Sequence, residues 1–355
     1  MRARWIDRWD GPLLGGERPA PEASVGEVLV AVEACGVGLT VLNCIRGDLA
    51  GDRSGLPRVP GHEYVGRIAA VGEGVDAGRV GERVVAYFYL FCGACRRCLA
   101  GTESLCESLG GYLGVDLDGG YAAYARLPAR NAIPIPEEIE SAAATAIPDA
   151  IATPIHVAAL AGIGAGERVA VIGAGGGVGV HMIQVARLRG AEVLALESSA
   201  PKREALTRKL DFECLDSADF GAVTLAARWP RGADVVVDLL GSEESLAWSL
   251  GAVREAARVV LLTTFPGVAG AVSPRDLVLR QISLLGSRYA SRHEVARGAE
   301  LVASGRIRPI VAEPVEADSV EAVHQELRAG SLLGRGALAW SDDERQRRPR
   351  GRGEE

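Results

Sequence analysis

The spacing of apolar residues changes twice between residues 168 and 197. A continuous apolar run over 169–172 predicts a buried strand. After a glycine-rich turn, apolar positions recur every three or four residues, at Val178, Met182 and Val185. Gly190 ends this predicted helix, and a second apolar run leads to Glu197. The pattern predicts a strand–helix–strand unit, which is typical of α/β proteins with a parallel sheet.

The turn between this strand and helix is built mainly of glycine. Without a Cβ, glycine lets the backbone turn tightly and approach a pyrophosphate, which then faces the amides at the helix start. Glu197 lies about 20 residues further on, where an acid hydrogen-bonds the adenosine ribose and repels a 2′-phosphate. We therefore predict a dinucleotide site that favours NAD over NADP. Its turn consists of Gly173, Ala174, Gly175, Gly176, Gly177, Val178 and Gly179.

A different pattern precedes this unit, and a similar one follows it. Residues 1 to about 150 are rich in glycine turns and short strands, which we predict at 28–34, 64–71 and 83–86. Beyond the unit, 234–239 and 258–262 are short of polar side chains, as strands covered on both faces are. The chain is thus expected to combine a β-rich domain with a doubly wound α/β domain.

Three further stretches have helical patterns. The alanine-rich stretch 142–161 predicts a helix that crosses into the α/β domain in spite of Pro148 and Pro154. From Ser287 onward the chain is expected to return to the first domain, with helices near 293–304 and 319–329.

Composition narrows the class of protein. A chain of 355 residues can form two domains with separate cores. No apolar run reaches the length of a membrane span and no signal-peptide pattern opens the chain, so we expect a cytoplasmic protein without membrane contact. A net charge of −7 argues against a nucleic-acid surface. Residues 342–355 are charged and lack apolar side chains, which predicts a disordered tail.

Four of the seven cysteines fall in one short loop with the spacing C-x2-C-x2-C-x7-C. Such a loop can wrap four thiolates around a tetrahedral ion, and without a secretory signal the spacing favours zinc over disulfides. An iron–sulfur cluster is the alternative, but no proline follows the last cysteine and no second set is present. With four protein ligands the predicted zinc is structural. Its ligands are Cys92, Cys95, Cys98 and Cys106.

Taken in order along the chain, these motifs resemble the zinc-containing medium-chain alcohol dehydrogenases. The resemblance extends to Trp340 and depends on Gly61-His62-Glu63, the four-cysteine loop, Gly119-Gly120-Tyr121-Ala122, the glycine turn and Val237-Asp238-Leu239-Leu240-Gly241. It implies a GroES-like catalytic domain at 1–150 with a structural-zinc loop at 91–107, a Rossmann NAD-binding domain at 151–286, and a return to the catalytic domain at 287–341. It also implies a small-molecule substrate and a homodimer or homotetramer.

The resemblance implies roles for individual residues by position. Thr40 matches the hydroxyl that hydrogen-bonds the substrate alcohol. His62 and Glu63 match a metal ligand and its neighbouring acid, and Asp149 stands where a third ligand, often cysteine, is found. Arg335 matches the arginine that reaches the cofactor pyrophosphate.

The sequence departs from the family at the first ligand of the catalytic zinc. Gly38 stands where a cysteine is usual, and Asn43 stands where some members have a proton-passing histidine. A metal normally lowers the pKa of the substrate hydroxyl and stabilises the alkoxide, so the loss matters for the chemistry.

Three interpretations of the site remain open. In the first, a zinc is held by His62, Glu63 and Asp149, with water and substrate completing its shell. The second recruits Cys44 through a rearranged loop. The third has no metal, and His62, Glu63, Asp149 and Thr40 form a hydrogen-bonding or acid–base set. The persistence of a histidine with two carboxylates favours the first.

Three functions follow from these interpretations. The leading hypothesis is an NAD-dependent oxidoreductase that transfers a hydride between nicotinamide and a small alcohol, aldehyde or ketone. The second is an enone- or enoyl-type C=C reductase, because a conjugated carbonyl already delocalises the developing charge. The third is a protein that binds NAD as a sensor and has lost turnover.

Overall fold

The chain forms two compact units that interleave in sequence. The structure, a computed structural model, describes residues 1–51, 55–221, 223–262 and 267–341, so the predicted tail at 342–355 lies outside the described residues. The first unit contains Met1–Asp149, Ala290–Gly305 and the described chain from Val311 onward. The second contains Ala150–Tyr289 and Arg306–Ile310, and this last short return was not predicted.

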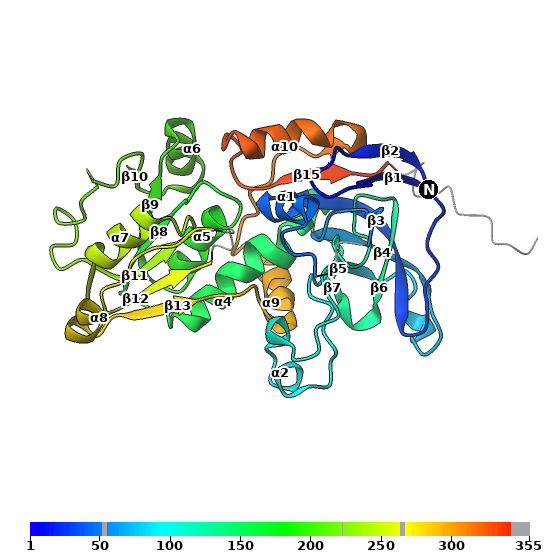
Figure 1. Cartoon of the computed structure of the whole chain (residues 1–355), viewed down its shortest axis with the longest axis horizontal. Coiled ribbons are helices and arrows are strands. Elements are labelled where there is room, and N and C mark those ends of the chain that lie inside the picture. Colours follow the sequence, from blue (N-terminus) through cyan, green and yellow to red (C-terminus); the bar gives the residue numbers. More distant parts are fainter. Residues whose placement is uncertain (52–54, 222, 263–266, 342–355) are drawn as a thin grey trace, which may run out of the picture. The chain divides into compact units, whose positions relative to one another are not determined.

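The first unit is built around a seven-stranded sheet (Figure 1). Its central strand β3 is eleven residues long and pairs antiparallel with β4 on one side and with β15 and β6 on the other. The order is β14-β15-β3-β4-β5-β7, and β1 and β2 form a separate hairpin. The strands are β1 (Arg2–Trp5), β2 (Leu14–Glu17), β3 (Glu27–Val37), β4 (Tyr64–Val71), β5 (Arg83–Ala86), β6 (Tyr124–Pro128), β7 (Ala132–Pro134), β14 (Val315–Glu316) and β15 (Gly336–Ala339).

The helices of this unit are short and lie between its strands in sequence. They are α1 (Leu39–Arg46), α2 (Arg96–Leu99), α3 (Ser141–Thr145), α9 (Arg292–Ala303) and α10 (Val320–Arg328). The predictions of strands at 28–34, 64–71 and 83–86 and of helices at 293–304 and 319–329 are confirmed by β3, β4, β5, α9 and α10. Apolar spacing located these elements because most of their apolar side chains are buried.

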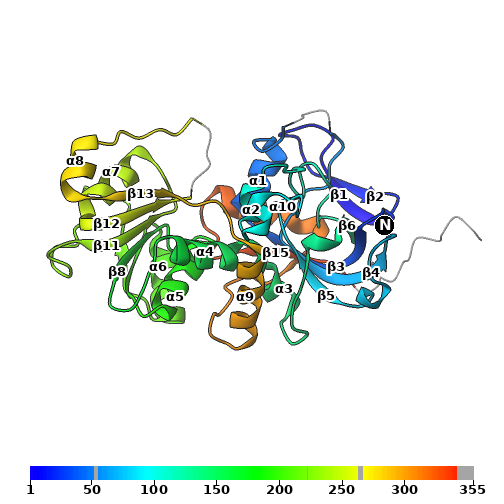
Figure 2. The same cartoon turned by 90° about the horizontal axis from the view of Figure 1, so that it is seen from below.

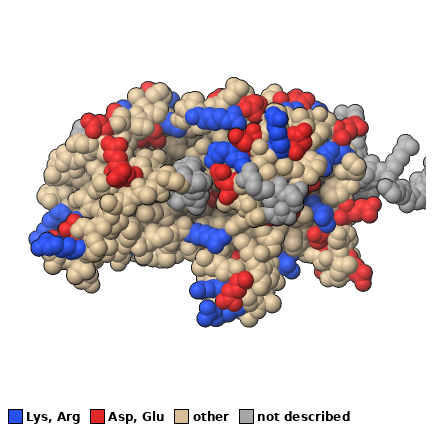
Figure 3. All heavy atoms as spheres, viewed as in Figure 1, with Lys and Arg blue, Asp and Glu red and all other residues tan. Residues whose placement is uncertain are grey.

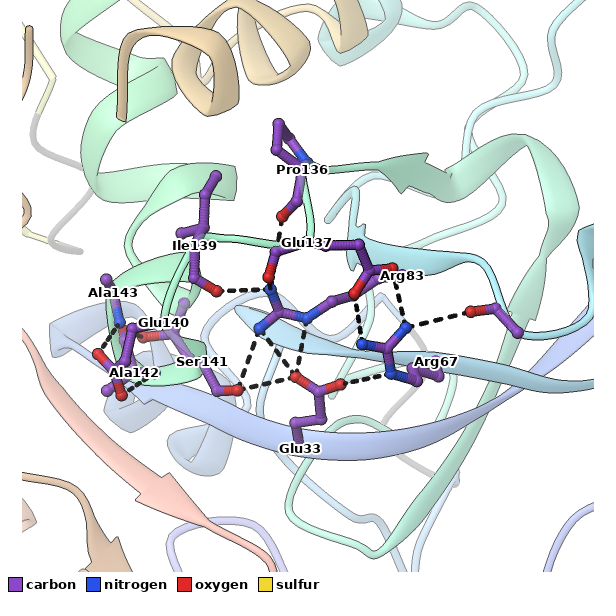
Figure 4. A network of polar contacts seen from close by, with 12 residues as sticks. Glu33, Arg67, Arg83, Pro136, Glu137, Ile139, Glu140, Ser141, Ala142 and Ala143 are labelled. Carbon is purple, nitrogen blue, oxygen red and sulfur yellow. Dashed lines mark hydrogen bonds and ion pairs between the residues drawn. The ribbon is translucent and has the colours of Figure 1, made fainter. Parts of the chain in front are cut away.

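A buried arginine ties the sheet to the segment that leads into α3 (Figure 4). Arg83 of β5 is 4% exposed and donates to Glu33 of β3 through Nε at 3.0 Å. Its Nη1 donates to the carbonyl oxygens of Glu137 and Ile139, and its Nη2 donates to the hydroxyl of Ser141 at 3.1 Å. The network therefore fixes the start of the helical segment that ends at the candidate site.

The second unit is a doubly wound α/β domain. Its six strands are all parallel, in the order β10-β9-β8-β11-β12-β13. Figure 2 shows α5 and α6 on one side of this sheet and α7 and α8 on the other. The strands are β8 (Arg168–Ile172), β9 (Glu192–Glu197), β10 (Cys214–Asp216), β11 (Ala233–Asp238), β12 (Val253–Leu261) and β13 (Ser283–Gly286). The helices are α4 (Ala152–Leu160), α5 (Gly179–Leu188), α6 (Ala200–Leu210), α7 (Glu243–Ala252) and α8 (Pro274–Arg280).

The helical structure predicted at 142–161 is confirmed, but the winding changes within it. The chain forms α3, then a π-helical turn at Ile147–Ile151, and then α4. Pro148 lacks the N–H that a continuous α-helix needs, which accounts for the change of winding there. Pro154 is accommodated because it lies in the first turn of α4, where the backbone N–H has no intrahelical partner.

The surface carries both signs of charge. On the face shown in Figure 3, acidic and basic side chains are interspersed. Among the described helices, none combines the length and the apolar character that crossing a bilayer requires.

Candidate functional site

The predicted glycine turn joins the carboxyl end of β8 to the start of α5. Gly173 has φ = 76°, a conformation that favours glycine. A Cβ on Gly175 would lie 2.7 Å from Oε2 of Glu197, and a Cβ on Gly179 would overlap the carbonyl oxygen of Gly173. The backbone clash shows that position 179 requires glycine, which lets α5 pack close to β8, and glycine at 175 leaves room for the Glu197 side chain against the turn.

Glu197 ends β9 and faces this turn. Its Oε2 accepts the backbone N–H of Gly175 at 2.9 Å, and its Oε1 accepts the backbone N–H of Ser199 at 2.9 Å. Oε1 also accepts the hydroxyl of Ser198, whereas Oε2 has a further lone pair that can accept a ribose hydroxyl. The turn and the acid thus fit the adenosine and pyrophosphate parts of a dinucleotide.

Lys202 is a candidate site residue that the sequence analysis missed. It lies in the first turn of α6, is 8% exposed, and passes close to the Cβ position of Gly175. Burial lowers the pKa of its ammonium group, and the Glu197 carboxylate opposes that shift. The available signal was a lone lysine five residues after the acid, but only the fold shows that it is buried.

The strand register of the first unit brings the other candidate residues together. In the antiparallel pair of β15 and β3, Gly336 lies opposite Val37. Arg335 directly precedes β15 and Gly38 directly follows β3, so both lie at this end of the pair. A Cβ on Gly38 would overlap Nη1 of the Arg335 guanidinium. The glycine at position 38 is therefore what leaves room for the arginine.

The pairing of β3 with β4 adds a histidine and an acid at the same end of the sheet. Cys35 lies opposite Tyr64, and the N–H of Gly36 donates to the carbonyl oxygen of Glu63 at 2.8 Å. A Cβ on Gly36 would lie 3.0 Å from Oε2 of Glu63, so this side chain lies directly against β3. His62 precedes it in the chain.

Arg335 is at the centre of a buried ionic cluster. Its Nη2 donates to Oδ2 of Asp149 at 2.9 Å, and its Nε donates to Oε1 of Glu63 at 3.2 Å. Asp149 comes from the π-helical turn, a kind of irregularity that often marks functional sites. The three residues are all less than 10% exposed. Burial raises the pKa of the Glu63 carboxyl, and Arg335 opposes that shift.

His62 lies beside the cluster but forms no hydrogen bond with Glu63, Asp149 or Arg335. Its ring packs on Phe88 with centroids 4.2 Å apart. Nε2 lies 3.6 Å from Oδ2 of Asp149, which is beyond hydrogen-bond distance. Neither ring nitrogen has a hydrogen-bond partner among the described residues, and Oε2 of Glu63 has none either. Buried polar atoms in native proteins are almost always paired, so these atoms indicate a place for a ligand.

Thr40 and Asn43, two residues considered in the sequence analysis, lie on α1. Thr40 is the second residue of the helix and is partly exposed, and no described hydrogen bond joins it to the cluster. Asn43 is buried, and its Oδ1 accepts from Nη2 of Arg46 at 2.6 Å. Asn43 is thus engaged within its own helix.

The four-cysteine loop fits a structural zinc ion. Sulfur ligands about 2.3 Å from a tetrahedral zinc lie about 3.8 Å apart. Sγ of Cys92 and Sγ of Cys98 are 3.9 Å apart, and Sγ of Cys95 is 3.4 Å from that of Cys98 and 3.9 Å from that of Cys106. Backbone N–H groups of Cys98 and Glu107 lower the pKa of Cys95 to about 6. These residues would hold a zinc that cross-links the loop.

The distances among His62, Glu63 and Asp149 suit a second metal ion, but the charge beside them does not. The ligand atoms of His62, Glu63 and Asp149 lie within 4.8 Å of one another, which a metal ion accepts. However, the Arg335 guanidinium already binds an oxygen of each carboxylate and adds a fixed positive charge beside the position. In this arrangement the residues do not fit a second zinc, which favours the metal-free interpretation.

Comparison with known proteins places the chain in a family. Residues 24–137 match the family described as alcohol dehydrogenase GroES-like domain, and residues 177–304 match the one described as zinc-binding dehydrogenase. The chain is 30% identical to an alcohol dehydrogenase of Geobacillus stearothermophilus, over 97% of this chain and 100% of that protein. It is 28% identical to an acryloyl-coenzyme A reductase of Metallosphaera sedula, over 89% of this chain and 92% of that protein.

A solved structure gives the same result. The crystal structure of an NAD-dependent alcohol dehydrogenase has a TM-score of 0.87 and 29% sequence identity, and the match covers 96% of this chain and 100% of that one. Fold, motifs and relatives thus agree over nearly the whole chain. The chain belongs to the zinc-containing medium-chain alcohol dehydrogenases, within the medium-chain dehydrogenase/reductase family, and is an enzyme of the oxidoreductase class.

Proposed function

We propose that this chain transfers a hydride between NAD and a small alcohol, aldehyde or ketone. The observation that carries the proposal is the buried imidazole of His62, whose ring nitrogens have no hydrogen-bond partner among the described residues. An unpaired buried polar group costs about 1–3 kcal/mol, and a substrate oxygen bound there would offset that cost. The family membership then assigns hydride transfer as the reaction class.

The chemistry requires a proton path as well as a hydride acceptor. Oxidation of an alcohol moves a hydride from the carbinol carbon to the nicotinamide, and the hydroxyl releases its proton as the carbonyl forms. We assign the hydrogen bond to the substrate oxygen to the Thr40 hydroxyl, and the further proton transfer to His62. In the reductive direction the same groups return the proton to the carbonyl oxygen.

NAD is the cofactor that the second unit supports best. Glu197 presents a negative charge where the 2′-phosphate of NADP would lie, and it is held there by the N–H groups of Gly175 and Ser199. One structural relative is described as NAD-dependent. The role of Arg335 at the cofactor pyrophosphate stays a prediction. Its guanidinium is bound by the carboxylates of Glu63 and Asp149.

A second candidate function is reduction of a C=C bond conjugated with a carbonyl or a thioester. The specific observation is the Arg335 guanidinium, which binds the carboxylates of both Glu63 and Asp149. It leaves these acids less available to a metal, and such a substrate needs a metal less because it spreads the developing charge onto its own carbonyl oxygen. The hydride adds to the β carbon, the electron pair moves toward the oxygen, and the α carbon takes a proton. An acryloyl-coenzyme A reductase is among the relatives.

Absorbance of NADH separates these functions. The enzyme is mixed with NADH and a panel of ketones, aldehydes, enones and enoyl thioesters, and the products are identified by mass spectrometry. Alcohol products support the first function, and saturated products with an intact carbonyl support the second. Tight NADH binding without turnover of any substrate contradicts both and supports a sensor.

Assembly and location are part of the same proposal. Among the described residues, β13 is an edge strand paired only with β12, and α8 beside it exposes Val278 and Leu279. Exposed apolar side chains next to an open strand edge are typical of an interface between copies of a chain, and we expect a homodimer or homotetramer. A cytoplasmic location would keep the four thiols of the zinc loop reduced.

A further inference from the structure

The side chain of Arg335 lies between the end of β3 and the carboxylates of Glu63 and Asp149. Arg335 is 5% exposed, and its guanidinium lies against Gly38, where a Cβ would overlap it. The backbone of Arg335 is fixed as well, because its carbonyl oxygen accepts the N–H of Ala312 at 2.8 Å. A side chain at position 38 would therefore overlap the guanidinium where it now lies, and a cysteine there would require the arginine to move.

The charges of the cluster are balanced by the same side chain. Nη2 of Arg335 lies 2.9 Å from Oδ2 of Asp149 and 3.0 Å from Oε1 of Glu63, so one cation bridges both acids. In a buried site, adding a divalent cation beside this guanidinium would bring like charges together in a medium that screens them poorly. The acids without the arginine would instead form a negative pocket with a free histidine, which is a suitable site for a divalent metal.

We propose that the Arg335 guanidinium takes the place of the second zinc ion. The folded chain then binds one zinc, in the four-cysteine loop, and Gly38 is the residue that makes the exchange sterically feasible. Arg335 acts as a positioning residue, because it fixes the two acids that flank His62 and leaves that imidazole for the substrate. The role of the pocket in binding substrate rests on the proposed function, whereas the number of metal ions does not.

Metal content per chain tests the proposal. The full chain is dialysed against zinc and then against zinc-free buffer, and zinc is measured by mass spectrometry together with the protein concentration. We expect one zinc per chain for the wild type and for Arg67→Met, a control arginine on the outer part of the same unit. Arg335→Met should raise the content to two, because it releases both carboxylates. Two zinc ions in the wild type, or one in a folded Arg335→Met variant, would overturn the proposal.

A second variant keeps the test decisive if Arg335→Met does not fold. Cys95→Ser removes a ligand of the four-cysteine loop and leaves Arg335 in place. We expect its zinc content to fall to about zero per chain, whereas a remaining full equivalent would show a second zinc beside the arginine and would refute the inference. Failure of every substrate to react would refute the proposed function but would leave the expected zinc contents per chain unchanged.

Discussion

The carboxylate of Glu197 accepts the N–H of Gly175 at 2.9 Å, so the acid at the end of β9 is held against the glycine turn. Glu197→Gln keeps the size of the side chain and removes its charge. Hydrogen bonds to charged groups contribute about 1.5–3 kcal/mol, so we expect the ratio of kcat/KM for NAD to that for NADP to fall about tenfold or more. Initial rates with both cofactors measure this ratio.

The matched control is Glu192→Gln, an acid at the start of the same strand that pairs with Arg228 on the surface. This variant should leave the cofactor ratio unchanged. An unchanged ratio in Glu197→Gln as well would show that this acid does not select the cofactor.

Arg83 should be one of the most sensitive positions in the first unit. Arg83→Met leaves the Glu33 carboxylate buried beside Ser141 with one ionic partner fewer, and breaking a buried pair costs about 3–5 kcal/mol. Urea unfolding measures the loss. The control is Arg67→Met, because Arg67 contacts Glu33 from a side chain that is 46% exposed, and such pairs contribute about 0–1 kcal/mol. Equal losses in the two variants would contradict this account.

Gly38→Ala tests the close contact with Arg335 directly. The new methyl group would overlap the guanidinium, and overpacking of this kind costs about 1–3 kcal/mol. Gly251→Ala is the control, because a Cβ there meets nothing within 4 Å and the residue lies in α7. Thermal unfolding should show a lower Tm for the first variant and an equal or higher Tm for the second. A Gly38→Ala protein as stable as the wild type would mean that the arginine lies elsewhere.

Loss of the structural zinc should destabilise the first unit. Cys95→Ser removes one ligand, and a chelator removes the ion, so both treatments should lower Tm and make the loop at 91–107 sensitive to protease. Cys214→Ser is the control, because this cysteine lies on β10 outside the loop. Its Tm and zinc content should match the wild type. No change of Tm on chelation would argue against a structural metal.

His324 makes stability depend on pH. Burial lowers the pKa of its imidazole below the ordinary value, and Nε2 is hydrogen-bonded to the hydroxyl of Tyr121 at 2.9 Å. Because the unfolded chain binds a proton more readily, the stability contribution is complete above about pH 6.5 and is lost as pH falls through the lower folded pKa. His324→Gln should unfold with a smaller difference between about pH 7.5 and about pH 5 than the wild type. An identical difference would show that other groups dominate.

The sequence predicted the structural features that depend on residues close together in the chain. The strands and glycine turn around Gly175 were predictable because apolar spacing and the absence of a Cβ are visible in the sequence. The winding of the segment around Asp149 was not, because a π-helical turn and a long helix share the same alanine-rich composition. The ion pairs of Arg335 with Glu63 and Asp149 were missed because they join residues 272 and 186 positions apart. Such contacts follow from strand register, which only the folded sheet reveals.

The shared space of Gly38 and Arg335 also couples the two positions in evolution. A mutation to cysteine at 38 is penalised sterically while the arginine stays. Loss of the arginine first leaves the carboxylates of Glu63 and Asp149 facing each other without a cation. Either order passes through a less fit intermediate, which is the signature of epistasis between contacting residues. Relatives that combine a cysteine at this position with the arginine should therefore hold its guanidinium away from position 38.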